Sequence, residues 1–225
     1  MKTNIVGSNL GSSGMGDILV LTSVCRHLEN CEVQLPFETA RFARFFKDIC
    51  DKVVITETPD VTPDEGEGHF AKAKLRHFGI ETEDYLPIVK ISDGEMNRGF
   101  ELIKDFENPI VFVPNCSVYW AEDRQPQKTF LQGVLNKLQE DHTVLQFGLS
   151  RNWTEFEGTI PMMDKSIFDL ICYYSAIGKY TGVCTGDSHL MLAVGGECDI
   201  YVPRTSSRNR KRWDYTSDKV RYHYV

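Results

Sequence analysis

Short apolar runs alternate with amphipathic stretches in the first third of the chain. The runs at 2–6, 32–35 and 53–55 have the length and composition of strands. Between them, apolar residues recur every three or four positions in 17–28 and 39–50, which predicts two helices with one buried face each. Strands that alternate with helices favour a parallel sheet with helical crossovers.

The same alternation begins again near residue 110. Helices are also expected at 69–78 and 93–106, and residues 85–91 are expected to connect two lobes. The second series comprises strands at 110–113, 143–147, 179–184 and 199–202 and helices at 128–140, 166–176 and 188–194. We therefore expect an α/β fold of two Rossmann-like lobes with parallel sheets. The expected divisions are an N-terminal lobe (1–88), a C-terminal lobe (89–203) and a basic, aromatic tail (204–225).

Composition and charge narrow the class of protein. The 225 residues are 41% hydrophobic and 25% charged, as in a globular protein, and no apolar run is long enough to cross a bilayer. The first residues lack a long apolar segment with a cleavage site, and the seven cysteines include no C-x-x-C pair, so we expect a cytoplasmic protein with reduced thiols. The oligomeric state is left open.

The net charge of −7 is unevenly distributed. Residues 57–68 carry five acidic groups and no base, whereas the tail carries seven bases against two acids. A basic, aromatic end could bind phosphates or nucleic acid, and it could equally be a solvated surface or pack back on the N-terminal lobe.

Ligands of open α/β sheets bind beyond the carboxyl ends of the strands, so the loops after these strands are the candidate sites. The first is the glycine-rich stretch 7–17, which follows a strand and opens a helix, although it is not a P-loop. Its Asp17 could cap the helix or act as a general base toward a sugar hydroxyl.

Two further loops have residues suited to phosphate. After the strand at 110–113 come Asn115, Ser117, Arg124 and Lys128, which could form a pyrophosphate site or an ordinary surface loop. After the strand at 179–184, hydroxyls and backbone N–H groups lead into a helix. This third candidate site comprises Thr185, Gly186, Asp187, Ser188 and His189. Asp187 or Ser188 could instead be the helix N-cap, and His189 a packed histidine.

The order of these segments resembles the lipopolysaccharide heptosyltransferases. Residues 15–28 resemble that family's Gly-Asp-hydrophobic helix start, and 113–117 its Pro-Gly-Ala-Ser turn. Residues 144–148 resemble the following strand with its glycine, Gly148. Residues 184–190 resemble the signature Asp-Ser/Thr-Gly-x-x-His-Leu, with Gly195 at the helix end. The resemblance extends over residues 4 to about 203.

The resemblance implies a glycosyltransferase B-type fold and an inverting transfer of a hexosyl, heptosyl or pentosyl group from a nucleotide-sugar, without a metal ion or other cofactor. Asp17 would be the general base, and Ser12, Ser13, Gly14 and Met15 would contact the acceptor. The implied donor-binding residues are Asn115, Ser117, Arg124, Lys128, Gly148, Thr185, Gly186, Asp187, Ser188 and His189.

Three departures from the family pattern leave alternatives open. Cys184 replaces the signature acid, Asp187 is an additional acid, and Asn115 replaces the turn glycine, in a chain that is shorter in its first lobe. One alternative is a phage-type DNA-modifying glycosyltransferase that binds DNA through the basic tail. A second is a non-catalytic nucleotide- or sugar-binding relative. A sugar-nucleotide epimerase is disfavoured, because a clean Gly-x-Gly-x-x-Gly and a Tyr-x-x-x-Lys pair are missing.

Overall fold

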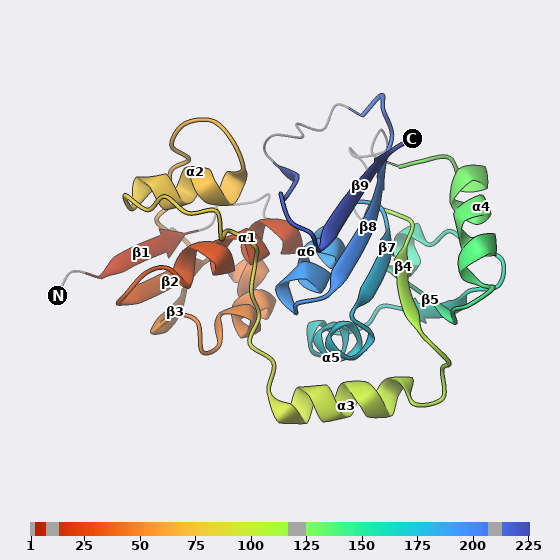
Figure 1. The fold of residues 1–225 in the computed structure, drawn as a ribbon. Helices are drawn as coiled ribbons and strands as arrows, with labels where there is room; N and C mark the ends of the chain where they lie inside the picture. Colours follow the sequence, from red (N-terminus) through yellow and green to blue (C-terminus); the bar gives the residue numbers. More distant parts are fainter. Residues whose placement is uncertain (1–2, 8–13, 117–124, 207–212) are drawn as a thin grey trace. The chain divides into compact units, whose positions relative to one another are not determined.

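The computed structural model describes residues 3–7, 14–116, 125–206 and 213–225 (Figure 1). These residues form two compact units. The first unit contains the described residues up to 90 together with 213–215, and the second contains 91–206 and 216–225. The chain therefore enters the first unit a second time before it ends in the second.

The first unit is built on a three-stranded parallel sheet in the order β1-β2-β3. Its elements are β1 (Asn4–Gly7), α1 (Met15–Cys25), β2 (Cys31–Leu35), the 3₁₀ helix η1 (Phe37–Phe46), β3 (Lys52–Ile55) and α2 (Phe70–His77). Helix α1 is apolar on nearly all sides, and every residue from Ile18 to Cys25 is buried. It therefore forms the core of this unit.

The helix expected at 39–50 is instead the 3₁₀ helix η1, which begins earlier and ends at Phe46. Its buried residues include Thr39, Phe42 and Phe45, which are spaced by three. A 3₁₀ helix has three residues per turn, so this spacing places all three on one face. The apolar pattern identified a helical segment but did not distinguish the two helix types.

The second unit is built on a six-stranded, entirely parallel sheet in the order β6-β5-β4-β7-β8-β9. Its helices are α3 (Asp93–Ile103), α4 (Lys128–Leu138), the short 3₁₀ helix η3 (Ser150–Asn152), α5 (Ile167–Ile177) and α6 (Gly186–Ala193). Its strands are β4 (Ile110–Val113), β5 (Val144–Gly148), β6 (Ile160–Met163), β7 (Lys179–Gly182), β8 (Glu197–Val202) and β9 (Val220–Tyr224).

Two strands of this sheet were not expected from the sequence. β6 is the short run Ile-Pro-Met-Met, which a proline interrupts, and three of its four residues, Pro161 among them, are exposed. Proline is tolerated there because β6 is at the edge of the sheet. β9 lies in the segment expected as a tail, at 204–225, and its register with β8 pairs Cys198 with Val220. The expected tail is therefore divided, with 213–215 in the first unit and β9 in the second sheet.

Helices cover both faces of the second sheet, with α4 on one side and α5 and α6 on the other (Figure 1). The core under α4 consists of Ile110, Phe112, Leu131, Leu135, Val144 and Phe156. The strand order reverses direction at β4, which has β5 on one side and β7 on the other. The carboxyl ends of β4 and β7 thus form the topological switch point, where ligands of such sheets bind. No helix in the described ranges is long and apolar enough to cross a membrane.

Candidate functional site

The turn between β1 and α1 ends at Gly14, the N-cap of α1. The Gly14 N–H donates to Asp17 Oδ2 at 2.9 Å, which closes the first turn of the helix. Asp17 and Met15 are half-buried and Gly14 is exposed. Ser12 and Ser13, the other expected acceptor contacts, lie outside the described residues. The N-cap is thus Gly14, and Asp17 is an acid of the first helical turn whose carboxylate is held by the Gly14 N–H.

Gly7, the first glycine of this stretch, contacts the protein's own backbone. A Cβ atom at Gly7 would lie 1.4 Å from the carbonyl oxygen of Asp60. Two hydrogen bonds fasten the approach: Gly7 N–H to Thr62 Oγ1 at 2.9 Å, and Thr62 N–H to the Gly7 carbonyl at 3.2 Å. The close approach that glycine permits here thus serves to hold segment 60–62 against the end of β1.

The end of β7 shows an equivalent approach in the second unit. Gly182 has φ +150°, and a Cβ atom there would lie 2.2 Å from the Val113 carbonyl oxygen. The Val183 N–H donates to the same carbonyl at 2.9 Å. This contact brings the turn before α6 directly onto the carboxyl end of β4, at the switch point of the sheet.

Helix α6 begins with a complete capping box. Thr185 is the N-cap: its Oγ1 accepts from the Asp187 N–H at 3.1 Å and from the Ser188 backbone N–H. The Ser188 Oγ in turn accepts from the Thr185 N–H at 3.2 Å and donates to the Thr185 carbonyl at 2.8 Å. Gly186 is half-buried, and His189 is buried with its N–H bonded to the Thr185 carbonyl. The sequence left the N-cap open between Asp187 and Ser188, whereas the structure assigns it to Thr185.

Asp187 is held by buried neighbours. The fully buried Tyr174 donates its hydroxyl to Asp187 Oδ1 at 2.8 Å, and Thr185 Oγ1 lies 3.4 Å from Oδ2. Burial raises the pKa of Asp187 above its ordinary value, and these hydrogen bonds only partly offset the effect. Asp187 therefore completes the hydrogen bonding of a buried tyrosine, a role that the sequence did not indicate.

Asn115 lies just beyond β4 and joins two loops. Its Nδ2 donates to the Asn152 carbonyl at 2.9 Å and to Thr154 Oγ1 at 3.0 Å. Asn152 Nδ2 returns a bond to the Cys116 carbonyl at 3.2 Å. The fully buried Gln146 adds a bond from its Nε2 to the Thr154 carbonyl at 2.7 Å. These amides fix the loop after β5 against the end of β4.

Trp153 is in the loop that these amides hold. Its ring atoms lie 3.5 Å from the position of a Cβ on Gly148, at the end of β5, and its side chain is half-buried. Gly148 and Asn115 were predicted from the sequence, whereas Trp153, Asn152 and Gln146 were not. The signal that could have found them is the polar and aromatic cluster Arg151-Asn152-Trp153-Thr154, which follows a strand of a parallel sheet.

The remaining donor candidates are only partly described. Lys128 is exposed at the first residue of α4, and its Nζ lies 5.5 Å from the centre of the Phe156 ring. Ser117 and Arg124 lie outside the described residues. Because β5, β4 and β7 are neighbours, the sheet brings Gly148, Asn115 and the start of α6 to one edge. Asp17 belongs to the other unit.

The acidic segment 57–68 is largely engaged by α2. Lys74, whose side chain is 5% exposed, pairs with Asp64 at 3.1 Å and donates to the Thr62 carbonyl at 2.6 Å. His77 pairs with Glu65 at 2.8 Å. A groove of about 500 Å³ lies between β1, segment 60–63 and the end of α2, and it contains none of the predicted site residues.

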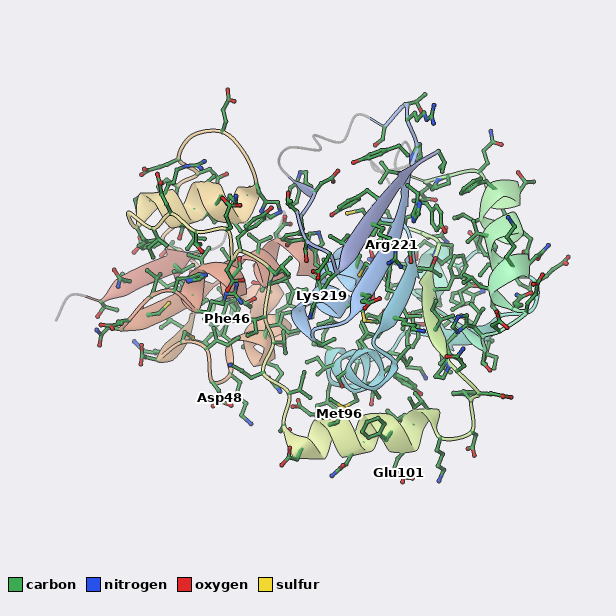
Figure 2. The ribbon with its side chains drawn as sticks, viewed as in Figure 1. Phe46, Asp48, Met96, Glu101, Lys219 and Arg221 are labelled. Carbon is green, nitrogen blue, oxygen red and sulfur yellow. The ribbon has the colours of Figure 1, made fainter. Side chains whose placement is uncertain are left out.

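The described cations of the tail bind groups of the protein itself at its surface. Arg204 donates to the Tyr224 carbonyl at 3.0 Å and Lys219 to the Gly195 carbonyl at 2.9 Å. Arg221, labelled in Figure 2, binds both carboxylate oxygens of Asp199, at 2.8 and 2.6 Å. The four other cations of the tail, Arg208, Arg210, Lys211 and Arg212, lie outside the described residues.

Aromatic stacking attaches residues 213–215 to the first unit. The Trp213 ring lies 5.2 Å from that of Phe70, and the Tyr215 ring 4.3 Å from that of His69. Residues 213–215 therefore belong to the first unit, while β9 belongs to the second. Among the described residues, no group of three or more potential ligands could hold a metal ion.

No family model matches the chain. No curated protein matches it. Solved structures similar to it include the ADP-heptose lipopolysaccharide heptosyltransferase II of E. coli, with 10% identity and a TM-score of 0.74 over 99% of this chain and 90% of that one. The E. coli heptosyltransferase WaaC with ADP has 8% identity and a TM-score of 0.56, over 98% and 92% of the two chains.

A third similar structure is TibC from enterotoxigenic E. coli H10407, described as an iron-containing dodecameric glycosyltransferase. It has 10% identity and a TM-score of 0.64 over 98% of this chain and 62% of that one. These likenesses show that the chain has the heptosyltransferase fold. The fold expected from the sequence resemblance, with two parallel α/β sheets, is thereby confirmed.

Proposed function

We propose that this protein is a glycosyltransferase that moves a sugar from a nucleotide-sugar to an acceptor hydroxyl with inversion. The observation that carries the proposal is the gathering of Asn115, Gly148 and the start of α6 at the switch point of a sheet, in a fold shared with heptosyltransferases. Fold alone does not define chemistry, and these residues are what a donor diphosphate and nucleoside would contact.

The donor would bind at the start of α6. The helix dipole and the backbone N–H of Gly186 favour an anion there, and Lys128, with Arg124 outside the described residues, would supply positive charge. Thr185 and Ser188 shape this turn through their capping box. The similar structures include a heptosyltransferase described with ADP and one named for ADP-heptose, so a nucleoside diphosphate sugar is the donor class to test first.

Asp17 would act as the general base. In the proposed step the acceptor oxygen forms a bond to the anomeric carbon while the bond from that carbon to the diphosphate oxygen breaks. The hydroxyl proton passes to the Asp17 carboxylate, and the leaving diphosphate keeps the bonding electron pair. The hydrogen bond from Gly14 orients one carboxylate oxygen and leaves the geometry of the turn fixed as the proton moves.

The test is a transfer assay with Asp17→Asn after the donor has been found in a panel of nucleoside diphosphate sugars. The asparagine can still accept from Gly14, so donor affinity should stay within about twofold while turnover falls about 10²- to 10⁴-fold. Turnover that survives the substitution would contradict the role of Asp17. Transfer without a metal ion is part of the proposal, and unchanged turnover after dialysis against EDTA would support it.

A non-catalytic nucleotide- or sugar-binding relative is the second candidate. Cys184 at the position of the family acid favours it. It is also favoured because Thr185 Oγ1 already accepts from the Asp187 N–H, and Asp187 already accepts from the Tyr174 hydroxyl. Donor binding without transfer or donor hydrolysis, across a broad acceptor panel, would identify this candidate.

The acceptor we propose is a carbohydrate. DNA is the alternative acceptor, but the described tail cations Arg204, Lys219 and Arg221 bind groups within the protein. DNA binding that weakens steeply with added salt would favour the DNA-modifying alternative, because each phosphate contact releases counterions.

A further inference from the structure

We propose that Trp153 is the surface on which the nucleotide base of the donor stacks, and that Asn115 positions it. This inference rests on the proposed function, because it assigns the part of the donor that lies beyond the diphosphate. Trp153 lies outside the segments that resemble the heptosyltransferases. Its assignment rests on the sheet order, the packing of its ring on Gly148 and the hydrogen bonds of its loop.

The order of the strands indicates where the nucleotide base would lie relative to the diphosphate. The start of α6, where the diphosphate would bind, follows β7, and Trp153 follows β5 with β4 between them. Neighbouring strands are separated by about 4.8 Å, so the ends of β7 and β5 are roughly 10 Å apart. A ribose can bridge that separation over the end of β4 and bring the base to the loop after β5.

Trp153 lies at the ligand edge of the sheet. Its indole packs on Gly148, the last residue of β5, where its ring atoms lie 3.5 Å from an added Cβ, and the residue stays partly exposed. Because tryptophan is large, part of its side chain commonly stays exposed even where it packs well. At the ligand edge of a sheet that part of the ring can receive a base, because every nucleobase has a π-face.

The loop that carries Trp153 is held on both sides. Asn115 Nδ2 binds the Asn152 carbonyl, just before Trp153, and Thr154 Oγ1, just after it. Asn152 binds back to Cys116, and Gln146 binds the Thr154 carbonyl. Bonds to both flanking residues fix the ring before any ligand arrives, which lowers the entropy lost on binding. Asn115 acts here as a positioning residue.

The experiment measures affinities for ADP, GDP, UDP, CDP and inorganic pyrophosphate by calorimetry, with wild type, Trp153→Ala, Trp153→Phe and, as a matched control, Trp213→Phe. Stacking energies per base predict that Trp153→Ala weakens the preferred nucleoside diphosphate about 5- to 150-fold. Pyrophosphate affinity should stay within about twofold. Trp153→Phe should give an intermediate loss, and Trp213→Phe none, since Trp213 packs on Phe70 in the first unit.

Two outcomes would overturn the inference while leaving the proposed function intact. One is unchanged nucleoside diphosphate affinity in Trp153→Ala. The other is an equal loss for pyrophosphate, which would indicate a general distortion. If wild type binds none of these diphosphates at millimolar concentration, the proposed function fails, and the inference fails with it.

Fluorescence keeps the inference testable if Trp153→Ala does not fold. Because the chain has three tryptophans, Trp120 is replaced by phenylalanine in every variant of this experiment. Binding of the preferred nucleoside diphosphate should then quench tryptophan emission in Trp213→Phe and should lose most of that quenching in Trp153→Phe. Quenching that is equal in the two variants would contradict stacking on Trp153. Adding Asn115→Ala to Trp213→Phe should shift the emission maximum in the absence of ligand. Asn115→Ala should also weaken nucleoside diphosphate binding less in Trp153→Ala than in wild type. Additive losses would contradict the positioning role.

Discussion

The β1–α1 and β7–α6 segments have the same plan in the two units, and they differ in what holds the acid at the helix start. In both, a strand ends at a glycine pressed onto another backbone carbonyl, from Asp60 at Gly7 and from Val113 at Gly182. In both, an aspartate lies in the first turn of the helix. Asp17 accepts from the N–H of the exposed Gly14, whereas Asp187 accepts from the buried hydroxyl of Tyr174.

This difference separates a structural acid from a candidate catalytic one. The Asp187 carboxylate is bound to side chains of the second unit's interior, so its removal should first affect stability. The bond that Asp17 accepts comes from a backbone N–H at the start of its own helix, so its replacement should first affect chemistry. Both acids suit helix N-termini electrostatically, and their positions in the sequence alone would not have distinguished them.

The largest expected effect on stability comes from the two strand-end glycines. Gly7→Ala and Gly182→Ala each place a methyl group inside the contact distance of a backbone carbonyl, and Gly182 also has φ +150°. We expect each to lower the free energy of unfolding by about 3 kcal/mol or more. Thermal and urea unfolding followed by circular dichroism would measure the loss.

The matched control is Gly94→Ala in α3, where an added Cβ meets nothing within 4 Å. It should stabilise the protein by up to about 1 kcal/mol, because alanine is the better helix former. Equal effects at Gly94 and Gly182 would show that the close approach at the end of β7 is not a constraint.

Tyr174→Phe should give the next largest effect. It removes the donor to Asp187 Oδ1 and leaves a half-buried carboxylate without that bond, at a cost of about 1–3 kcal/mol. Tyr173→Phe is the control, since both rings pack edge-on against Phe147. A melting temperature that falls equally in the two variants would contradict a specific role for the Tyr174–Asp187 bond.

A smaller effect, and one that depends on pH, is expected for Asp187→Asn. Burial raises the pKa of Asp187, so the protonated form is favoured in the folded state and its stabilising contribution is lost as pH rises through that raised pKa. The asparagine variant does not titrate. Its free energy of unfolding should therefore rise relative to that of wild type as pH rises from about 4, the ordinary aspartate value, through the raised pKa of Asp187, as urea unfolding would show.

Asp199→Asn should show the opposite trend. Although burial acts to raise the pKa of Asp199, hydrogen bonds from Arg221 and His223 hold it below its ordinary value. Its contribution is present above the unfolded pKa of about 3.9 and is lost as pH falls through the folded one. The free energy of unfolding of wild type should therefore rise relative to that of Asp199→Asn as pH rises from about 2 to 5. Parallel pH profiles for the two variants would contradict the contrast.

The smallest effect is expected for Gly14→Ala. Gly14 has φ −73°, and an added Cβ would lie 3.8 Å from Asp17 Oδ2. Alanine should be accommodated there at a cost below about 1 kcal/mol, the loss expected on replacing an N-cap glycine. A much larger loss of stability would show that the β1–α1 turn is as sterically constrained as the β7–α6 turn.

The strands and helices followed from the sequence wherever the apolar pattern was regular. β4, β7 and α4 lie at their expected positions, because buried strands and amphipathic helices have distinct periods. β6 was missed because its Pro161 and exposed side chains mark an edge strand, and β9 because its basic and aromatic residues were interpreted as a tail. Edge strands bury little apolar surface, so their sequences show little regular alternation of apolar and polar residues.

The candidate site divides in the same way. Asn115, Gly148 and Thr185 could be placed at one edge of the sheet from the sequence, because each lies at or just after the end of a strand and a parallel sheet brings the carboxyl ends of its strands together. Trp153 could not be singled out, because its loop is held by hydrogen bonds from Asn115, 38 residues earlier in the chain.

The sequence by itself determined the alternation of strands and helices, the parallel sheets and the glycine-rich strand ends, because these follow from local periodicity and backbone sterics. Only the tertiary structure decided which acid is buried against Tyr174, which glycine meets a distant carbonyl and which residues hold Trp153. These are contacts between segments far apart in the chain, and their energies depend on burial and distance that local sequence does not encode.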